Sequence, residues 1–313
     1  MTPTFAIHNN VVICGTTTST VTPTPTTSPT PTQGCVQPPS DMVGWWPLDE
    51  TQGSTAHDIA GSFNNDGTWM GSPGTVTGKV AGALRFNGSN YVEVGPAQTE
   101  INFQTNEDFS IDVWVQTVGS QSTRTLVDKR TENPQGNVIR GYHLYLYNGK
   151  PGLQLADGSY TNYNSTASTA FVADGNWHHI AVTVDRNNTS GLNIYVDGTS
   201  TASLDPTAHV GNLTNSAPLV FGGKNQITPS FTFVGILDEL ELFNRALTQT
   251  EIQDIYNAGS AGKCKPTPTP TPKGKGIISG FVEYADEEPL EGVTVGIKGE
   301  FSDSTETDED GYY

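Results

Sequence analysis

The segment from His57 to Gly67 collects side chains that suit a metal ion. It contains the carboxylates of Asp58 and Asp66 and the amide of Asn65, and its glycines let the backbone bend. Calcium takes about six to eight oxygen ligands, many of them carbonyl oxygens, so a bent loop of this composition suits it. We predict a structural calcium ion with Asp58 and Asn65 among its ligands. The alternative, that these side chains only stabilise turns, stays open.

A run of aromatic residues has the chemistry to bind sugars. In the stretch Tyr142–Tyr147, the two-residue period of a strand puts His143, Tyr145 and Tyr147 on one face, and a polar loop with Tyr160 follows. Aromatic rings stack on the apolar faces of pyranose rings. We therefore predict Tyr145, Tyr147 and Tyr160 as ligand-binding residues. Tyrosine is also an ordinary strand residue, which is the alternative.

Glycoside hydrolysis with retention needs two carboxyl groups about 5–5.5 Å apart. The nearest pattern is Leu237–Glu241, where Glu239 and Glu241 share one face of a strand. Alternating glutamates on an edge strand usually face solvent. We predict no catalytic residues and no enzyme activity.

The charge balance narrows the range of partners. The chain has 33 acidic and 15 basic residues, a net charge of −18. Such a surface repels nucleic acids and anionic membranes, so neither is an expected partner. Thr, Ser, Asn and Gly are abundant, which is typical of an exported β-protein. No stretch approaches the roughly 18 apolar residues of a membrane helix. We expect a monomeric extracellular module, secreted or displayed on a cell surface.

Two Thr-Pro runs divide the chain, and they contain eight of its 20 prolines. Prolines favour extended polyproline II and predict linkers at residues 22–34 and 265–276. A large domain is expected between them, at residues 35–264. Residues 1–21 would then be the tail of a preceding module and residues 277–313 the truncated start of a further β-domain.

Cys35 and Cys264 lie just inside the two linkers. In a sandwich whose first and last strands are neighbours, a disulfide between them would clamp the two ends of the domain. The chain-entropy model assigns such a long loop about 4–5 kcal/mol of stabilisation. An extracellular setting favours the bridge, and the alternative is three unrelated thiols. Cys14 is left over and is expected to pair outside this chain.

The central segment reads as short strands separated by clusters of Gly, Asn, Asp and Ser. The runs with strand-like patterns are Val43–Leu48, Phe109–Val115, Arg124–Lys129, Tyr142–Tyr147, Gly152–Leu155, Trp177–Val184, Leu192–Val196, Leu219–Phe221 and Val234–Phe243. The stretch Ala83–Val94 predicts a β-hairpin around Asn87–Asn90. The stretch Thr248–Tyr256 predicts the one helix, because Thr248 can cap it and Glu251 follows three residues later. The fold class is therefore all-β, with one short helix near the end of the domain.

Several motifs resemble the laminin-G-like, concanavalin A-like domains of bacterial surface and secreted proteins. They are GWWPLDE, GKVAGALRFNGSNYVEV, FSIDVWV, NWHHIAVTVD, NIYVDG and GILDELELFNRALTQTEIQDIYNAG. The resemblance covers residues 40–262 and implies a two-sheet antiparallel jelly-roll sandwich. It also implies that Asp238, in the last strand, meets Asp58 at one edge as a calcium ligand. Glucanases of this architecture carry a Glu-x-Asp-x-x-Glu motif, which is absent here.

The C-terminal stretch Ile278–Tyr313 resembles the opening of a carboxypeptidase-regulatory-like or Cna-B-like β-sandwich. The strand GVTV and the turn Thr307–Tyr312 carry this second resemblance. Only the opening strands are present, so this fragment is expected to be poorly stable alone.

Together these patterns predict a non-catalytic extracellular module that binds a carbohydrate or mediates adhesion within a larger multidomain protein. Its expected partner is a glycan or an extracellular protein. Two alternatives remain: a structural spacer domain without a ligand, and an accessory domain of a secreted glycoside hydrolase.

Overall fold

The computed structural model describes residues 7–8, 11–14, 34–61, 64–95, 98–119, 123–133, 138–158, 163–165, 168–223, 232–266, 281–284, 291, 294–297 and 303–306. The chain divides into two compact units. One runs from Thr30 to Pro266, and the other combines Met1–Pro29 with Thr267–Tyr313.

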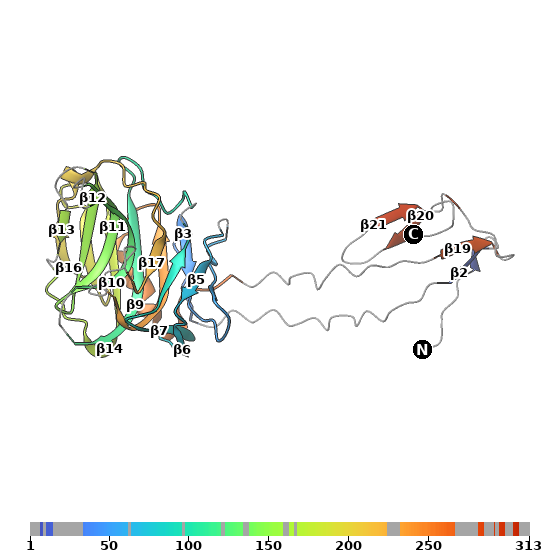
Figure 1. Ribbon diagram of the computed structural model, residues 1–313, viewed down its shortest axis with the longest axis horizontal. Helices are drawn as coiled ribbons and strands as arrows, with labels where there is room; N and C mark the ends of the chain where they lie inside the picture. The colour runs from blue at the N-terminus through green and yellow to red at the C-terminus, as the bar shows by residue number, and fades with distance from the viewer. Residues whose placement is uncertain are drawn as a thin grey trace. The chain divides into compact units, whose positions relative to one another are not determined.

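The larger unit is a sandwich of two antiparallel sheets (Figure 1). The first, called here the β11 sheet, has the strand order β13-β12-β11-β10-β17-β8-β5-β4. Its strands are β13 (Tyr163–Ser165), β12 (Lys150–Asp157), β11 (Val138–Tyr147), β10 (Thr123–Asn133), β17 (Leu219–Phe221), β8 (Tyr91–Val94), β5 (Gly67–Met70) and β4 (Thr55–Ala56).

The second sheet, called here the β9 sheet, has the order β16-β15-β14-β9-β18-β7-β6, and β3 also pairs with β18. Its strands are β16 (Thr199–Leu204), β15 (Leu192–Val196), β14 (Asp174–Val184), β9 (Phe109–Val118), β18 (Val234–Phe243), β7 (Gly82–Asn87), β6 (Gly74–Thr77) and β3 (Met42–Trp46). The predicted two-sheet jelly-roll architecture is confirmed.

The hydrophobic core lies between the two sheets, and strict alternation along the strands fills it. On β9, Phe109, Ile111, Val113 and Val115 point inward and are fully buried. Burying each such side chain contributes roughly 1.5–3 kcal/mol. The pattern Phe109–Val115 therefore sets which face of the strand meets the other sheet.

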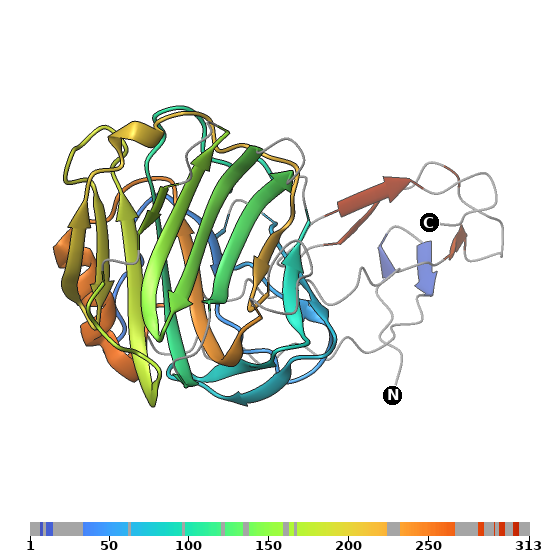
Figure 2. The same ribbon diagram turned by 60° about the vertical axis from the view of Figure 1, so that its left-hand side comes forward.

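A short helix covers part of the outer side of the β9 sheet. Helix α1 (Gln249–Ala258) begins at the predicted cap, where Thr248 and Glu251 form a capping box. Figure 2 shows the helix at the left-hand side of the sandwich. Ile252 and Ile255 pack against Phe243 of β18, so the helix adds a small second core. Two 3-10 turns, η1 (Thr207–His209) and η3 (Gly259–Ala261), complete the elements among the described residues of this unit.

The predicted hairpin at Ala83–Val94 is wrong. Strand β7 pairs with β6 and β18, whereas β8 pairs with β5 and β17, so the two strands belong to different sheets. The turn at Asn87–Asn90 carries the chain from one sheet to the other, and Asn87 N donates to Asn90 Oδ1 over 2.9 Å. A turn motif specifies a change of direction but not the partner of each strand.

The smaller unit contains a three-stranded sheet in the order β1-β2-β19 and a ladder of β20 with β21. These strands are β1 (Ile7–His8), β2 (Val11–Cys14), β19 (Phe281–Tyr284), β20 (Thr294–Ile297) and β21 (Asp303–Glu306). Strand β2 pairs antiparallel with β19, so the two ends of the chain share a sheet. The domain boundaries and the second family resemblance stay predictions. Within the described residues, none of the helices is long and apolar enough to span a bilayer.

Candidate functional site

Asp58 lies in the loop that follows β4 and accepts four hydrogen bonds. Its Oδ1 accepts hydrogen bonds from Trp45 N and Ala60 N, at 2.8 and 2.9 Å. Its Oδ2 accepts from both the backbone N and the Nδ2 of Asn65, at 3.3 and 3.0 Å. Burial raises the pKa of Asp58, and the four hydrogen bonds oppose that rise. The carboxylate thereby ties the loop to β3.

This arrangement leaves Asp58 little capacity for a calcium ion. A carboxylate offers about four lone-pair sites, and N–H donors already use them. Asn65 is buried and donates its Nδ2 to Val43 O over 2.9 Å, while its Oδ1 has no hydrogen-bond partner among the described residues. The described part of the chain holds no cluster of three His, Cys, Asp or Glu side chains able to hold a metal. Asp58 as arranged does not fit a calcium ligand, and calcium elsewhere in the loop stays a prediction.

Asp238 lies on β18 in different surroundings. Its Oδ2 accepts from Val80 N over 2.8 Å and it has no hydrogen-bond partner in common with Asp58. The side chain is fully buried, and burial raises its pKa to about 8. Its contacts brace the turn at residues 78–81 against β18. Its predicted role as a calcium ligand beside Asp58 is untested.

The tyrosine run lies on β11 with the predicted alternation. Tyr142, Leu144 and Leu146 belong to the core between the sheets. His143 and Tyr145 lie on the opposite, outer face, and their rings are 5.0 Å apart between centroids. The register places them beside polar neighbours, because His143 pairs with Asp128 and Tyr145 pairs with Thr125.

The neighbours of Tyr145 form a buried polar patch. Arg130 Nε and Nη2 contact the two carboxylate oxygens of Asp128 at 2.7 and 3.2 Å. Thr125 Oγ1 lies 2.9 Å from His143 Nε2. Tyr145 is only 6% exposed, and burial raises its pKa to about 12. Its ring therefore has too little free surface to stack on a sugar as the molecule stands.

Tyr147 is the member of the predicted set that reaches solvent, with 47% of its surface exposed. It ends β11 and is followed by the tight turn Asn148–Gly149 into β12. Tyr160 lies outside the described residues. Of the three predicted ligand-binding tyrosines, one is thus exposed, one is buried and one is not described.

Phe171 is an exposed aromatic residue that the sequence analysis missed. It is 44% exposed, and its side chain lies over Gly149, in the turn that follows Tyr147. A Cβ built on Gly149 would come within 2.3 Å of Phe171 Cε2, so the absence of a side chain there makes room for the ring. Val172 N donates to Gly149 O over 2.8 Å and fixes this segment. Phe171 lies outside any strand, so no periodic pattern marked it.

The expectation that Glu239 and Glu241 face solvent on an edge strand is wrong. Strand β18 lies inside its sheet, paired with β9, β7 and β3. Glu239 and Glu241 are 1% and 0% exposed, and lysines near the end of the domain contact both carboxylates. A period-2 pattern of charges cannot reveal that another segment covers it.

The two-sheet sandwich with a capped C-terminal helix defines a jelly-roll module. Its family follows from the sequence match: residues 86–253, more than half of the chain, fit the concanavalin A-like lectin/glucanases superfamily, and the chain belongs to this family. A curated relative, a botulinum-like toxin from an Enterococcus species, is 26% identical over 188 residues. That match covers 58% of this chain and 14% of the toxin, so the chain spans about one seventh of that relative.

Solved structures share the fold at low identity. The binding domain of Paraclostridial Mosquitocidal Protein 1 superposes with a TM-score of 0.56 and 19% identity, over 70% of this chain and 52% of that one. Domain 4 of AbnA, an extracellular arabinanase of Geobacillus stearothermophilus solved with arabinotriose, gives 0.51 and 20%, over 68% and 97%. The receptor-binding domain of botulinum neurotoxin mosaic serotype C/D gives 0.53 and 15%, over 69% and 50%.

Proposed function

We propose that this protein is a non-catalytic extracellular module that binds a glycan at the β11–β12 turn. The observation that carries the proposal is the pair of exposed aromatic side chains, Tyr147 and Phe171, on the two segments that meet at Gly149. Exposed aromatic rings on a rigid sandwich can stack on the apolar faces of sugar rings, and nearby polar groups can form hydrogen bonds with the sugar hydroxyls.

The turn is rigid, which favours binding. Tyr147 pairs with Lys150 across a two-residue turn, and Val172 N is hydrogen-bonded to Gly149 O. Aromatic side chains on a fixed turn lose little conformational freedom when a ligand arrives. Thr123, the strand partner of Tyr147 on β10, adds a hydroxyl beside the ring.

The similar structures support a binding role. Among those reported above are the binding domains of a mosquitocidal protein and of a neurotoxin, and Domain 4 of an arabinanase solved with arabinotriose. The disulfide between Cys35 and Cys264 supports an oxidising, extracellular setting. The two carboxylates that the sequence offered for hydrolysis, Glu239 and Glu241, are both covered, so neither can reach a sugar as the molecule stands.

A second candidate is an accessory domain of a secreted glycoside hydrolase. The observation that favours it is the likeness to Domain 4 of the arabinanase, nearly all of whose length matches this fold. This candidate predicts binding to arabinan oligosaccharides, whereas the first leaves the glycan open. One array that contains both plant and animal glycans separates them.

The test is a glycan array probed with the full chain, its Tyr147→Ala variant and its Phe171→Ala variant. We expect selective binding by the wild type and a loss of at least about tenfold in affinity for each variant, the equivalent of roughly 1.4 kcal/mol. Met70→Ala, which truncates another exposed apolar side chain on β5, is the matched control and should bind normally. Binding that survives in both aromatic variants would contradict the proposed site.

A further inference from the structure

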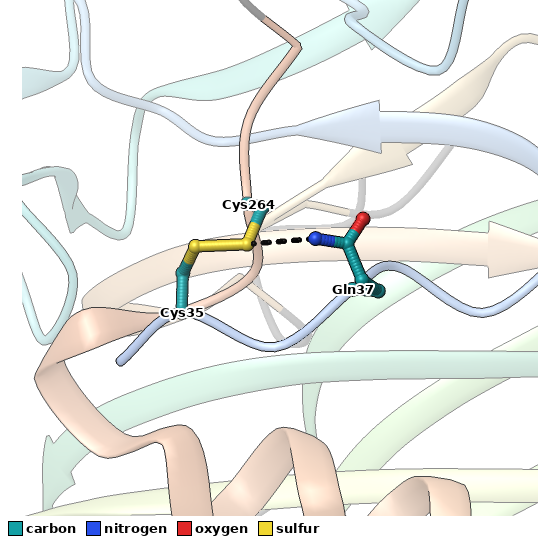
Figure 3. The surroundings of a disulfide bond; sticks show 3 residues. All are labelled: Cys35, Gln37 and Cys264. Atoms are coloured by element: carbon teal, nitrogen blue, oxygen red, sulfur yellow. Dashed lines mark hydrogen bonds between the residues drawn. A yellow bond between two sulfur atoms is a disulfide. The ribbon is translucent and has the colours of Figure 1, made fainter. Parts of the chain in front are cut away.

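The segment Gly262–Lys265, called here the exit segment, leaves the sandwich beside its first residues. Val36 N donates to Gly262 O over 3.0 Å, and Cys264 N donates to Val36 O over 2.8 Å. Cys264 is bonded to Cys35 (Figure 3), as predicted from the sequence, and both residues are partly exposed. The exit segment is thus held by two backbone hydrogen bonds and one covalent bond.

Lys263, next to the disulfide, is inserted into a buried acidic cluster. Its Nζ lies 2.7 Å from Glu241 Oε1, and the two side chains are 2% and 0% exposed. Asp112 is the cross-strand neighbour of Glu241 and is also fully buried. His179 Nε2 lies 3.3 Å from Asp112 Oδ2 on the other side. The ring of Trp45, 5.7 Å from Lys263 Nζ, completes the surroundings.

Lys265 makes a second contact of the same kind. Its Nζ lies 2.7 Å from Glu239 Oε1 and 2.5 Å from Asp49 Oδ2. Glu239 is 1% exposed, and its other oxygen accepts a hydrogen bond from Trp45 Nε1 over 2.9 Å. The two lysines that flank Cys264 therefore supply the ammonium groups that contact Glu239 and Glu241.

The charges in this cluster depend on the exit segment. Burial raises the pKa of Glu241 well above its usual value, and the neighbouring Asp112 raises it further. Burial also raises the pKa of Asp112, but the Lys263 charge and the hydrogen bond with Glu241 lower it to about 2. Asp112 therefore stays ionised, and Lys263 balances its buried negative charge. Removing one partner from a buried ion pair leaves an uncompensated charge and is strongly destabilising.

We propose that the exit segment is a redox-controlled clasp, in which the Cys35–Cys264 bridge holds Lys263 inside the Asp112–Glu241 cluster. An external thiol attacks the partly exposed disulfide, and two thiol molecules convert it into two cysteine thiols while they are oxidised to one disulfide. The freed exit segment withdraws Lys263, and the cluster between β9 and β18 loses its counter-ion. The partly exposed Cys35–Cys264 bond thereby controls the buried contact of Lys263 with the Asp112–Glu241 cluster of the β9 sheet.

The first experiment measures hydrogen exchange in the folded full chain, with and without a thiol reductant. We expect reduction to speed amide exchange in β18 around Glu239–Leu242 and in β9 around Asp112, by at least about tenfold. Cys35→Ser should reproduce this change without reductant, which separates the bridge from any effect at Cys14. Faster exchange confined to residues 34–37 and 262–265 would overturn the proposal.

The second experiment separates the counter-ion from the entropy of loop closure, because any bridge stabilises a chain through that entropy. Urea unfolding midpoints are measured with and without reductant for the wild type and for the triple variant Asp112→Leu, Glu241→Leu, Lys263→Met. The triple variant keeps the bridge but lacks the charges of Asp112, Glu241 and Lys263. We expect reduction to shift the wild-type midpoint more than that of the triple variant. Equal shifts in the two proteins would show that Lys263 is not controlled by the bridge.

Discussion

The indole nitrogen of Trp45 donates a hydrogen bond to Glu239 Oε2 over 2.9 Å, and both side chains are buried. Strand β18 has an extra residue between Asp238 and Glu241, where the register with β9 shifts. Glu239 occupies this bulge with a positive φ of 50°, a conformation that costs a non-glycine residue free energy. The Trp45 hydrogen bond and the Lys265 contact hold the bulge in place.

Trp45→Phe keeps a ring in this position but removes the donor. We expect it to lower the free energy of unfolding by about 1–3 kcal/mol, because Glu239 Oε2 is left buried without that partner. Trp69→Phe is the matched control, since Trp69 Nε1 has no hydrogen-bond acceptor among the described residues. Urea unfolding of both variants gives the comparison, and equal losses would argue against a role for the hydrogen bond.

Asp58→Ala removes the acceptor of four hydrogen bonds at once. We expect a loss of roughly 2–4 kcal/mol in the free energy of unfolding. Because the N–H donors fill the carboxylate, this loss should be the same in calcium and in EDTA. Thermal unfolding of wild type and variant in both buffers tests it. A calcium-dependent stabilisation that the variant lacks would restore Asp58 as a metal ligand.

Lys129 should make stability depend on alkaline pH. Its Nζ donates to Asn102 Oδ1 and Asn215 O, each at 3.0 Å, and burial lowers its pKa from 10.5 to about 8. Between these two values the unfolded chain binds a proton that the folded chain has released. Stability attributable to Lys129 therefore rises from pH 8 to pH 10.5, by up to about 3 kcal/mol.

Other groups titrate in the same window, so the relevant measurement is a difference. Urea unfolding of wild type and Lys129→Met is compared at both ends of this pH range. We expect the stability difference between the two proteins to shift in favour of the wild type as the pH rises. A difference that does not change with pH would mean that the ammonium is equally charged in the folded and unfolded states.

Gly149→Ala tests the proposed glycan site without removing an aromatic ring. A Cβ at this position would overlap Phe171, so the ring must leave its place over the turn. We expect affinity for the glycan to fall about as much as in Phe171→Ala. Gly53→Ala is the control, because Gly53 also has a positive φ but nothing lies within 4 Å of its Cβ position. The control should lose stability through backbone strain and keep its affinity. Equal affinity in the two alanine variants would place the glycan elsewhere.

The sequence predicted the features that depend on local patterns. The alternation along Phe109–Val115 and Tyr142–Tyr147 matches which side chains enter the core. The cap at Thr248 and Glu251 marks the start of the helix. These signals work because strand period and helix capping act over a few residues.

Features that depend on distant segments were not accessible from those patterns. The turn at Asn87–Asn90 looked like a hairpin because a local motif cannot say which sheet each strand joins. Glu239 and Glu241 looked solvated because the lysines that cover them lie beyond helix α1 in the sequence. Phe171 belongs to no periodic pattern in the sequence. Its ring lies in the space that is free because Gly149 has no side chain.

The bridge between Cys35 and Cys264 also changes how the chain transmits mechanical load. Their Cα atoms are 5.0 Å apart although 229 positions separate them in sequence. A pull on the residues before Cys35 and after Cys264 is carried across the covalent bridge, and the strands between them bear none of it. Without the bridge, unravelling the 229 residues would release a tether of roughly 760–820 Å, at about 3.3–3.6 Å per residue. With the disulfide intact, the tension passes through the bridge and not through the strands. The domain can therefore stay folded under forces that would unfold it if the bridge were absent.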